Sequence, residues 1–434
     1  MVRRGSFGAA LVGSVVSVLT FGGCSVRVGS DAHRNDPTGP DAATSGNGST
    51  GAPDVRRDAG PDGAAPDASA PPPSGACALV GTEKRVALES GTDAFAWIWD
   101  GVRYVVAYAD PAGRGGDVHT VFLDTDGNVL APPTVVEATD AESTLPAIVA
   151  TSRGYMVAWQ EGSAGKAVYG RAIDENGNAY GRSVTIATTS APESRPVVSR
   201  APGGIAIAYM DEWLGAPTVQ IAQFDAELNV VGPKQIASTA TAASFPALAG
   251  DALALAIAWS DARDGASDIR FASVGADLTT SKETTLRAGA PHDARLARII
   301  KAGDGYLSAW EDMRSDDNQI YMAIVDRTGA VVAGGLVEEP GTGDANWPNM
   351  AFAGSMSAIA YYQWRAERPQ VFVTFIDTAG RRLSGMPHDL QVSATTGTAR
   401  FPDVAWNGRD FGVAWIDTRD GGPALYFARA ACAP

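Results

Sequence analysis

The sequence predicts an all-β protein in which seven four-stranded antiparallel sheets form a ring. Three observations lead to this fold class. A repeat of about fifty residues occurs seven times between residue 77 and the end of the 434-residue chain. The second segment of each repeat is apolar at consecutive positions, which indicates that both of its faces are buried. The chain also contains 49 glycines and 26 prolines, residues that favour turns.

The repeat is marked by an alanine followed by an aromatic residue. The seven pairs are Ala107-Tyr108, Ala158-Trp159, Ala208-Tyr209, Ala258-Trp259, Ala309-Trp310, Ala360-Tyr361 and Ala414-Trp415. Successive aromatic residues lie 51, 50, 50, 51, 51 and 54 residues apart. This period and the burial on both faces describe a seven-bladed β-propeller. A parallel β-helix would repeat at about half this period or less, and separate sandwiches would need about 100 residues per unit.

Each repeat divides into four short strands separated by turns. In the second repeat we expect them at 147–150, 155–159, 167–173 and 183–187, with the alanine–aromatic pair on the second strand. An Asp-x-x-Gly turn joins the third and fourth strands in four repeats, at 124–127, 174–177, 326–329 and 377–380. Asp and Gly supply the local hydrogen bonds and the positive φ that such turns need.

The last repeat holds only three strands, which end near Arg429. The segment 85–89, which precedes the first repeat, matches the outer strands of the other blades. We therefore expect it to complete the seventh blade, since ring closure of this kind removes the exposed sheet edges that promote aggregation. The repeat spacing places Cys77 and Cys432 together in the turn region between the third and fourth strands. In an exported protein such a pair predicts a disulfide; two free buried thiols are the alternative.

The N-terminus has the features of an export signal. Two arginines at 3 and 4 precede an apolar run over 7–21, which ends in Gly-Gly-Cys. This segment resembles the signal peptides of bacterial lipoproteins, and the resemblance implies cleavage after residue 23 and a lipid on Cys24 that anchors the chain in a membrane. Ser25 implies export to the outer membrane, so the expected location is the cell envelope. An uncleaved membrane anchor and an ordinary signal peptide are the alternatives.

The segment 24–76 consists mostly of Asp, Ala, Pro, Gly and Ser, with almost no large apolar residue. Such a segment cannot bury enough apolar surface to offset the entropy of ordering it. We interpret it as a tether with a root-mean-square span of roughly 40 Å; a recognition segment is the alternative. The predicted organisation is therefore a signal peptide at 1–23, a lipidated tether at 24–76 and a propeller at 77–434.

Charge and composition exclude several kinds of partner. The formal net charge of -15 disfavours nucleic acid, which is bound through lysine and arginine. Three cysteines and four histidines are too few for an ordinary structural zinc site. The acidic loop 312–317 lacks the strict spacing of a calcium loop. No phosphate-binding loop and no Ser/His/Asp arrangement occurs. We therefore predict no metal and no cofactor. We also expect the chain to be monomeric.

A Trp-x-Asp-x-Arg motif recurs in three blades. It comprises Trp259-Asp261-Arg263, Trp310-Asp312-Arg314 and Trp415-Asp417-Arg419, and Trp159 occupies the tryptophan position in the second blade. The three side chains point the same way in a strand. Because the motif recurs, we interpret it as structural: an ion pair and a turn cap that order the loop after the second strand.

A second set of residues differs from blade to blade. Each lies just ahead of an innermost strand, where propellers bind ligands around their central channel. The set is Arg195, Phe245, Arg295, Trp347, Arg400 and Phe401. Arginine and aromatic side chains together suit a carboxylate, a sugar face or a peptide. The alternative is that they plug the channel.

Three arginines at one mouth of a propeller resemble the carboxylate clamp of sialidases, and the repeats as a whole are similar to exported bacterial propellers related to that superfold. The sequence lacks the Ser-x-Asp-x-Gly-x-x-Trp turns of sialidase blades, and no tyrosine nucleophile with its glutamate is assignable. We therefore expect a non-catalytic binding module that recognises protein, peptide or glycan on one propeller face. A sialidase-like or polysaccharide-degrading enzyme is the alternative.

Overall fold

The structure, a computed structural model, describes residues 75–88, 91–110, 116–162, 167–189, 194–213, 216–225, 229–235, 242–287, 292–315, 317–340, 343–365 and 368–433. The predicted signal peptide, Cys24 and nearly all of the predicted tether lie outside these residues. Within the described ranges, no helix has the length and hydropathy needed to cross a membrane.

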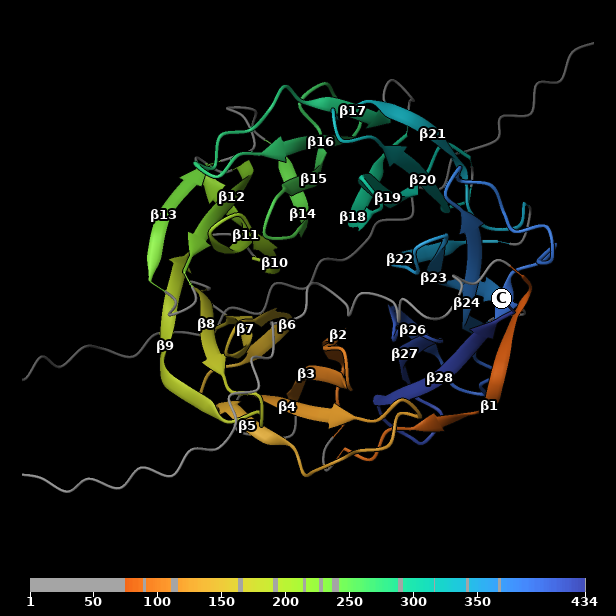
Figure 1. Cartoon of the computed structure of the whole chain (residues 1–434), viewed down its shortest axis with the longest axis horizontal. Helices are drawn as coiled ribbons and strands as arrows, with labels where there is room; N and C mark the ends of the chain where they lie inside the picture. The colour runs from red at the N-terminus through yellow and green to blue at the C-terminus, as the bar shows by residue number, and fades with distance from the viewer. Residues whose placement is uncertain are drawn as a thin grey trace, which may run out of the picture. The chain divides into compact units, whose positions relative to one another are not determined.

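Seven antiparallel sheets of four strands each are arranged around a central axis (Figure 1). We call each sheet a blade and number the blades by the order of their inner strands. Blades 1 and 2 are β2(Ala94–Trp99) β3(Tyr104–Asp110) β4(Asp117–Leu123) β5(Thr134–Glu137), and β6(Ser143–Thr151) β7(Gly154–Glu161) β8(Ala167–Ile173) β9(Ala179–Thr188). Blades 3 and 4 are β10(Val197–Ala201) β11(Gly204–Trp213) β12(Ala216–Phe224) β13(Val230–Gln235), and β14(Ala243–Gly250) β15(Leu255–Asp261) β16(Asp268–Val274) β17(Thr284–Arg287). Blades 5 and 6 are β18(Ala294–Ala302) β19(Gly305–Asp312) β20(Gln319–Val325) β21(Val331–Leu336), and β22(Ala345–Phe352) β23(Met356–Arg365) β24(Arg368–Asp377) β25(Leu390–Gln391). Blade 7 is β26(Ala399–Trp406) β27(Phe411–Asp417) β28(Ala424–Cys432) with β1(Cys77–Arg85) as its outer strand.

The predicted seven-bladed β-propeller is therefore confirmed. All seven alanine–aromatic pairs lie on the second strand of a blade, where the alanines are completely buried. In blade 2 the four strands contain the predicted segments and extend beyond three of them; the inner strand β6 begins four residues earlier, at Ser143.

The N-terminal strand closes the ring, as expected, but with a different segment. Strand β1 pairs with β28 in an antiparallel register that shifts between Val80 and Lys84. The expected strand at 85–89 is wrong, because only Arg85 belongs to β1. Val86 still donates its N–H to Leu425 O at 2.8 Å, and its buried side chain packs in the cluster that joins blades 7 and 1. The apolar pattern that suggested a strand therefore reflects packing between two blades.

Cys77 and Cys432 form the predicted disulfide, which joins positions 355 residues apart. Their predicted place in a turn is wrong, because the two cysteines lie directly opposite each other in β1 and β28. The difference arises because β28 continues as a strand to Cys432. The bridge therefore ties the closing strand to its neighbour within the sheet.

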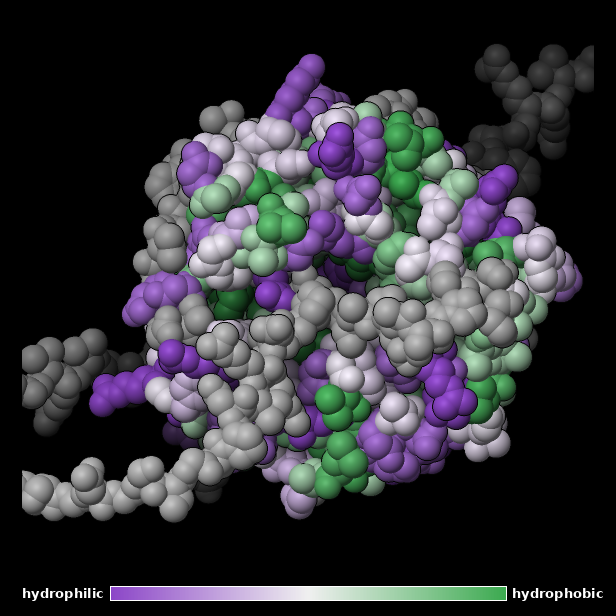
Figure 2. Space-filling model, in the orientation of Figure 1, coloured by the Kyte–Doolittle hydropathy of each residue, from purple (hydrophilic) through white to green (hydrophobic). Residues whose placement is uncertain are grey.

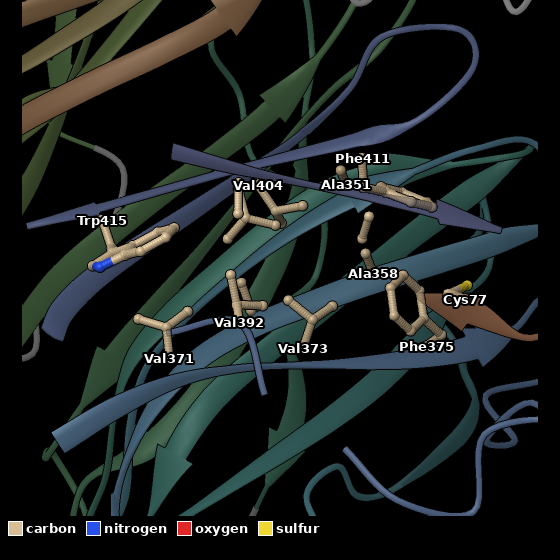
Figure 3. Close-up of a cluster of buried hydrophobic side chains, with 14 of the residues drawn as sticks. Cys77, Ala351, Ala358, Val371, Val373, Phe375, Val392, Val404, Phe411 and Trp415 are labelled. Carbon is tan, nitrogen blue, oxygen red and sulfur yellow. The ribbon is translucent and has the colours of Figure 1, made fainter. Parts of the chain in front are cut away.

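The apolar core lies between blades rather than within a single sheet. Figure 3 shows one such cluster, in which Val371, Val373 and Phe375 from β24 pack near Phe411 and Trp415 from β27. Both faces of each second strand are covered in this way, which explains the runs of consecutive apolar residues. Every blade consequently depends on its neighbours for burial.

In four blades, an Asp-x-x-Gly turn packs against the preceding blade. In blade 1, Asp124 Oδ1 accepts hydrogen bonds from the backbone N–H groups of Asp126 and Asn128 at 2.9 and 2.8 Å. Gly127 has a φ of 74°, and a Cβ there would collide with the ring of Phe427 on blade 7. The same turn in blade 2 places Gly177 against Phe122 of blade 1. These turns join the third and outer strands, away from the central channel.

Candidate functional site

Six of the seven inner strands begin with an unusual backbone conformation. A large residue with positive φ precedes the strand or lies near its start: Leu145 (51°), Arg195 (44°), Phe245 (51°), Leu296 (53°), Trp347 (58°) and Phe401 (54°). We call these six the bulge residues, because the pairing register shifts at this point in five of the strands. Positive φ is uncommon for bulky side chains and persists only where the surroundings impose it.

The preceding blade supplies hydrogen-bond acceptors that hold the bulges. Glu311 Oε1, on the second strand of blade 5, accepts from Trp347 N at 2.9 Å. Gln160 Oε1 accepts from Arg195 N at 3.4 Å, and Met210 Sδ from Phe245 N at 3.3 Å. Glu311 and Gln160 are buried, and each acceptor residue directly follows the aromatic residue of its repeat. The neighbouring blade therefore offsets the cost of the bulge.

A cavity of ≈ 550 Å³ lies on the axis of the ring and is lined by residues of all seven inner strands or the positions just ahead of them. Figure 2 shows a hollow at the centre of the face in view, with hydrophilic and hydrophobic residues around it. Five of the six bulge residues line this cavity; Leu296 does not. A volume of this size is typical of small-molecule sites, which span about 300 to 1,000 Å³.

Four of the six residues predicted for ligand binding line the cavity: Arg195, Phe245, Trp347 and Phe401. The guanidinium carbon of Arg195 lies 4.9 Å from the Phe245 ring centroid and 5.6 Å from that of Trp347. The Trp347 and Phe401 rings meet edge to face, with their centroids 4.9 Å apart. These side chains therefore form one connected group at the mouth of the channel.

The other two predicted residues, Arg295 and Arg400, do not line the cavity. Arg295 Nε donates to Glu311 Oε2 at 3.0 Å, and the guanidinium carbon of Arg400 lies 5.4 Å from the ring of Trp364. Each stands one residue before a bulge residue. Of the three arginines of the expected clamp, Arg195 lines the cavity, whereas Arg295 and Arg400 both act on Tyr362 outside it.

Three polar residues of the channel wall were not predicted from the sequence: Arg298, Asn349 and Asp403, on the inner strands of blades 5, 6 and 7. Each pairs with the repeated alanine of the neighbouring second strand. The equivalent residues in blades 1 to 4 are Ala96, Ala147, Val197 and Ala247. All seven lie twelve residues before the aromatic of their repeat. Aligning the repeats would have shown that this position turns from apolar to polar in three consecutive blades.

We call Arg298, Asn349 and Asp403 the polar arc. Arg298 Nε donates to Asn349 Oδ1 at 3.1 Å, and Asn349 Nδ2 donates to Pro402 O at 2.8 Å. Asp403 Oδ1 accepts from Val404 N at 2.8 Å. The hydrogen bonds therefore link three adjacent blades along one side of the cavity.

Burial shifts the ionisation of both charged groups in the polar arc. It raises the pKa of Asp403 to about 7, although the Val404 N–H, Arg298 and Trp97 act in the opposite direction. It lowers the pKa of Arg298 to about 10, and the positive charge of Arg195 adds to the effect. Each side chain presents only part of its surface to the channel. Protein surrounds both groups and replaces the water that would solvate their charges.

The Trp-x-Asp-x-Arg residues lie on the second strand of their blades and in the loop that follows, and none of them lines the cavity. Trp259 Nε1 donates to Asp261 Oδ2 at 2.9 Å, and Arg263 N and Nε donate to Asp261 Oδ1 at 3.0 and 2.8 Å. The corresponding Trp Nε1 to Asp Oδ2 distances in the other two motifs are 3.1 and 3.2 Å. Burial favours a raised pKa for Asp261, but the hydrogen bonds from Arg263 and Trp259 outweigh it and lower the pKa. These contacts are those of an ion pair and a turn cap.

Trp159 lies in blade 2, where a glutamate replaces the aspartate of the motif. Trp159 Nε1 donates to Glu161 Oε2 at 3.1 Å, and the indole stacks on Tyr169 of the neighbouring strand. Trp159 is completely buried. It therefore belongs to the blade core.

Among the residues that the structure describes, the acidic side chains of the cavity wall are Asp93 and Asp403, and no tyrosine, histidine or cysteine belongs to the lining. Among the described residues, no group of three or more His, Cys, Asp or Glu side chains is placed to hold a metal ion. The chemistry that the wall offers is therefore recognition through two guanidinium groups, one amide, two carboxyls and several aromatic rings.

The chain matches no protein-family model and no curated protein. It resembles the crystal structure of a protein of unknown function from Dyadobacter fermentans DSM 18053, with 11% identity, a TM-score of 0.52, and coverage of 82% of this chain and 99% of that one. The β-propeller domain of Myceliophteria thermophila Cps50 (Swd1) is similar at 12% identity, a TM-score of 0.49 and coverage of 81% and 99%. The Trypanosoma rangeli sialidase in complex with the inhibitor DANA is similar at 9% identity, a TM-score of 0.41 and coverage of 71% and 57%. At such identities the likeness concerns the fold alone. The part of the chain that the structure describes is a seven-bladed β-propeller.

Proposed function

We propose that this protein is a binding module of the cell envelope and that its ligand occupies the central channel. The observation that carries the proposal is the polar arc, where a repeat position that is apolar in four blades carries arginine, asparagine and aspartate in three adjacent ones. A repeated residue usually serves the repeated scaffold. A departure confined to one side of a cavity suits a ligand that is itself asymmetric.

The mouth of the channel supports the same proposal. Arg195, Phe245, Trp347 and Phe401 meet there through cation–π and edge-to-face contacts. Arginine and aromatic side chains are enriched at the sites that contribute most to binding energy. Their bulged backbone holds them on the cavity, which favours a pre-formed site.

The composition of the wall favours binding over the alternative of glycoside hydrolysis. A sialidase-type mechanism uses a tyrosine nucleophile, and other glycosidases use two carboxyl groups at a set separation across the scissile bond. In the described part of the chain, the lining residues include no tyrosine. Of the two lining carboxyls, Asp403 accepts a hydrogen bond from Val404 N and lies in the polar arc on one side of the channel.

The envelope location rests on the N-terminal sequence and on the disulfide. Disulfides persist in exported proteins and are rare in the reducing cytosol. The Cys77–Cys432 bridge therefore supports export. We propose that the lipid on Cys24 tethers the propeller to the outer membrane and that the propeller acts there as a monomer.

A ligand array tests the binding function. Fluorescently labelled protein is applied to arrays of glycans, peptides and small organic ligands, with Arg195→Ala as the channel variant and Arg409→Ala as its matched control. Arg409 lies in the turn between the first two strands of blade 7, and its side chain is 86% exposed. We expect Arg195→Ala to lose the array signal and Arg409→Ala to keep it. Signals that both variants retain would place the binding site outside the channel.

A further inference from the structure

We infer that the ligand of the channel is a compact organic carboxylate with an apolar body, whose carboxylate binds at Arg298 and Arg195. The inference rests on the proposed function, since it takes the channel as the binding site, and it adds the chemical class of the ligand. It follows from how charge, apolar surface and free hydrogen-bond donors are distributed over the wall.

The apolar part of the ligand follows from the wall of blades 1 to 4. There the positions equivalent to the polar arc carry only alanine or valine, and the next residues along three of these strands are Ile148, Val198 and Leu248. Burying apolar ligand surface against this side is favourable at about 25 cal/mol per Å². A strongly hydrated body, such as a sugar with hydroxyl groups on every side, would leave its polar groups unpaired there.

The anionic part of the ligand follows from two arginines that both lie close to the ring of Trp347. The guanidinium carbons of Arg298 and Arg195 lie 5.2 and 5.6 Å from the centroid of Trp347. Their proximity contributes to the lowered pKa of Arg298. An anion bound between them would offset both the mutual repulsion and the loss of solvation.

Arg298 has hydrogen-bond donors available for such an anion. A guanidinium carries five N–H donors. Among the described residues, Arg298 uses Nε for Asn349 and makes one long contact from Nη1 to Ala297 O, at 3.5 Å. The remaining terminal donors suit the two oxygens of a carboxylate, which guanidinium groups bind in a bidentate manner.

The neighbouring acid, Asp403, favours a ligand group that carries a single negative charge. The Asp403 carboxyl lies on the same arc, and its charge contributes to the electrostatic environment of Arg298. Because the pKa of Asp403 is about 7, the protonated form can donate a hydrogen bond to a carboxylate oxygen, whereas the ionised form repels anions. A phosphate dianion would meet stronger repulsion. The cavity volume of ≈ 550 Å³ also limits the ligand to a small molecule or to one terminal group of a larger one.

The test uses the mature exported chain and four defined compounds in isothermal titration calorimetry. The compounds are 3-phenylpropionate, its neutral amide, glucuronate and inorganic phosphate. We expect 3-phenylpropionate to bind and each of the others to bind at least tenfold more weakly, because a charge-assisted hydrogen bond contributes about that factor. Equal binding of acid and amide, or preference for glucuronate or phosphate, would overturn the inference.

Variants connect the binding to the arginine. Arg298→Gln should weaken 3-phenylpropionate binding about tenfold or more, and Arg409→Gln should leave it unchanged. A melting curve for each variant reports folding. If Arg298→Gln does not fold, Asp403→Asn is the second variant. It removes the negative charge of the Asp403 carboxylate, which repels the ligand, so 3-phenylpropionate should bind more tightly at pH 8. Unchanged affinity in the variant used would exclude the polar arc as the carboxylate site.

The array separates failure of this inference from failure of the proposed function. An array ligand that loses binding in Arg195→Ala but is neutral or a sugar would leave the channel as the binding site and overturn the ligand class alone. Array binding that no channel variant affects would overturn both.

Discussion

The guanidinium carbon of Arg195, from blade 3, lies 5.6 Å from the ring centroid of Trp347, from blade 6. In a ring of seven blades these two belong to opposite sides, so their contact spans the mouth of the channel. A ligand that enters by this mouth must pass or displace this pair. A substitution in this pair should therefore weaken ligand binding at a modest cost in the stability of the fold.

Replacement of Trp347 by alanine should weaken ligand binding at a modest cost in stability. Trp347 is half-buried at the mouth, whereas Trp259 is completely buried in a blade core. We expect Trp259→Ala to lower the free energy of unfolding by roughly 3 to 5 kcal/mol and Trp347→Ala to lower it by clearly less. Urea denaturation and titration with an array ligand measure both quantities. A larger loss of stability for Trp347→Ala would assign that residue to the scaffold.

Reduction of the Cys77–Cys432 disulfide should lower the melting temperature. The bridge closes a loop of 355 residues, for which the chain-entropy model gives about 6 kcal/mol as an upper figure. It also ties the closing strand β1 to β28, so Cys77→Ser should favour detachment of that strand. Scanning calorimetry with and without reductant measures the shift, and hydrogen exchange of residues 77–85 reports the strand. An unchanged melting temperature, with mass spectrometry showing reduced thiols, would contradict this account.

Binding of an anionic ligand should weaken as the pH rises from 6 to 8. Burial raises the pKa of Asp403 to about 7, so the carboxyl is mostly neutral at pH 6 and mostly charged at pH 8. Arg298 acts on Asp403, Arg195 and Glu311 act on Arg298, and Asp93 also belongs to the lining of the cavity. A newly ionised Asp403 there reduces the net positive potential that attracts the anion. Titrations at several pH values should show this dependence in the wild type and not in Asp403→Asn.

Glu338 should make the protein less stable at alkaline pH. Burial raises its pKa to about 8, with the nearby Asp389 adding to the effect. Between its unfolded pKa of about 4.5 and its folded pKa the native state holds a proton that the unfolded state releases, so stability falls as the pH rises across this window. At pH 8.5 we expect Glu338→Gln to be more stable than the wild type by on the order of a few kcal/mol, with little difference near pH 4. The exposed Glu175→Gln is the control, and urea denaturation across this range measures the effect.

Lipidation should require Cys24. Cys24→Ala should yield an unlipidated precursor or a soluble product, because the thiol that we propose as the lipid attachment site is missing. Metabolic labelling with a fatty acid in a bacterial expression host detects the modification, and fractionation of the cell envelope locates the protein. A wild-type chain that takes up no label would contradict the lipid anchor.

The amino-acid sequence by itself determined the architecture of this protein. The spacing of the alanine–aromatic pairs predicted the number of blades, and the incomplete last repeat predicted closure by an N-terminal strand. The same repeat spacing brought Cys77 and Cys432 together. These features are readable because every blade must bury the same face against its neighbour, so the same residues recur at the same interval.

Only the tertiary structure decided which side chains line the channel. A bulge of one residue reverses the face to which each side chain points, so Phe401 faces the cavity and the adjacent Arg400 does not line it. The outer strand β1 likewise begins at Cys77 because its pairing with β28, and not its own apolar pattern, defines it. The pKa of Asp403 is raised because the carboxyl is buried among residues that lie far apart in the sequence, such as Trp97 and Arg298. Local pattern therefore specified the repeated scaffold, whereas the site arises where non-repeated residues converge across the ring.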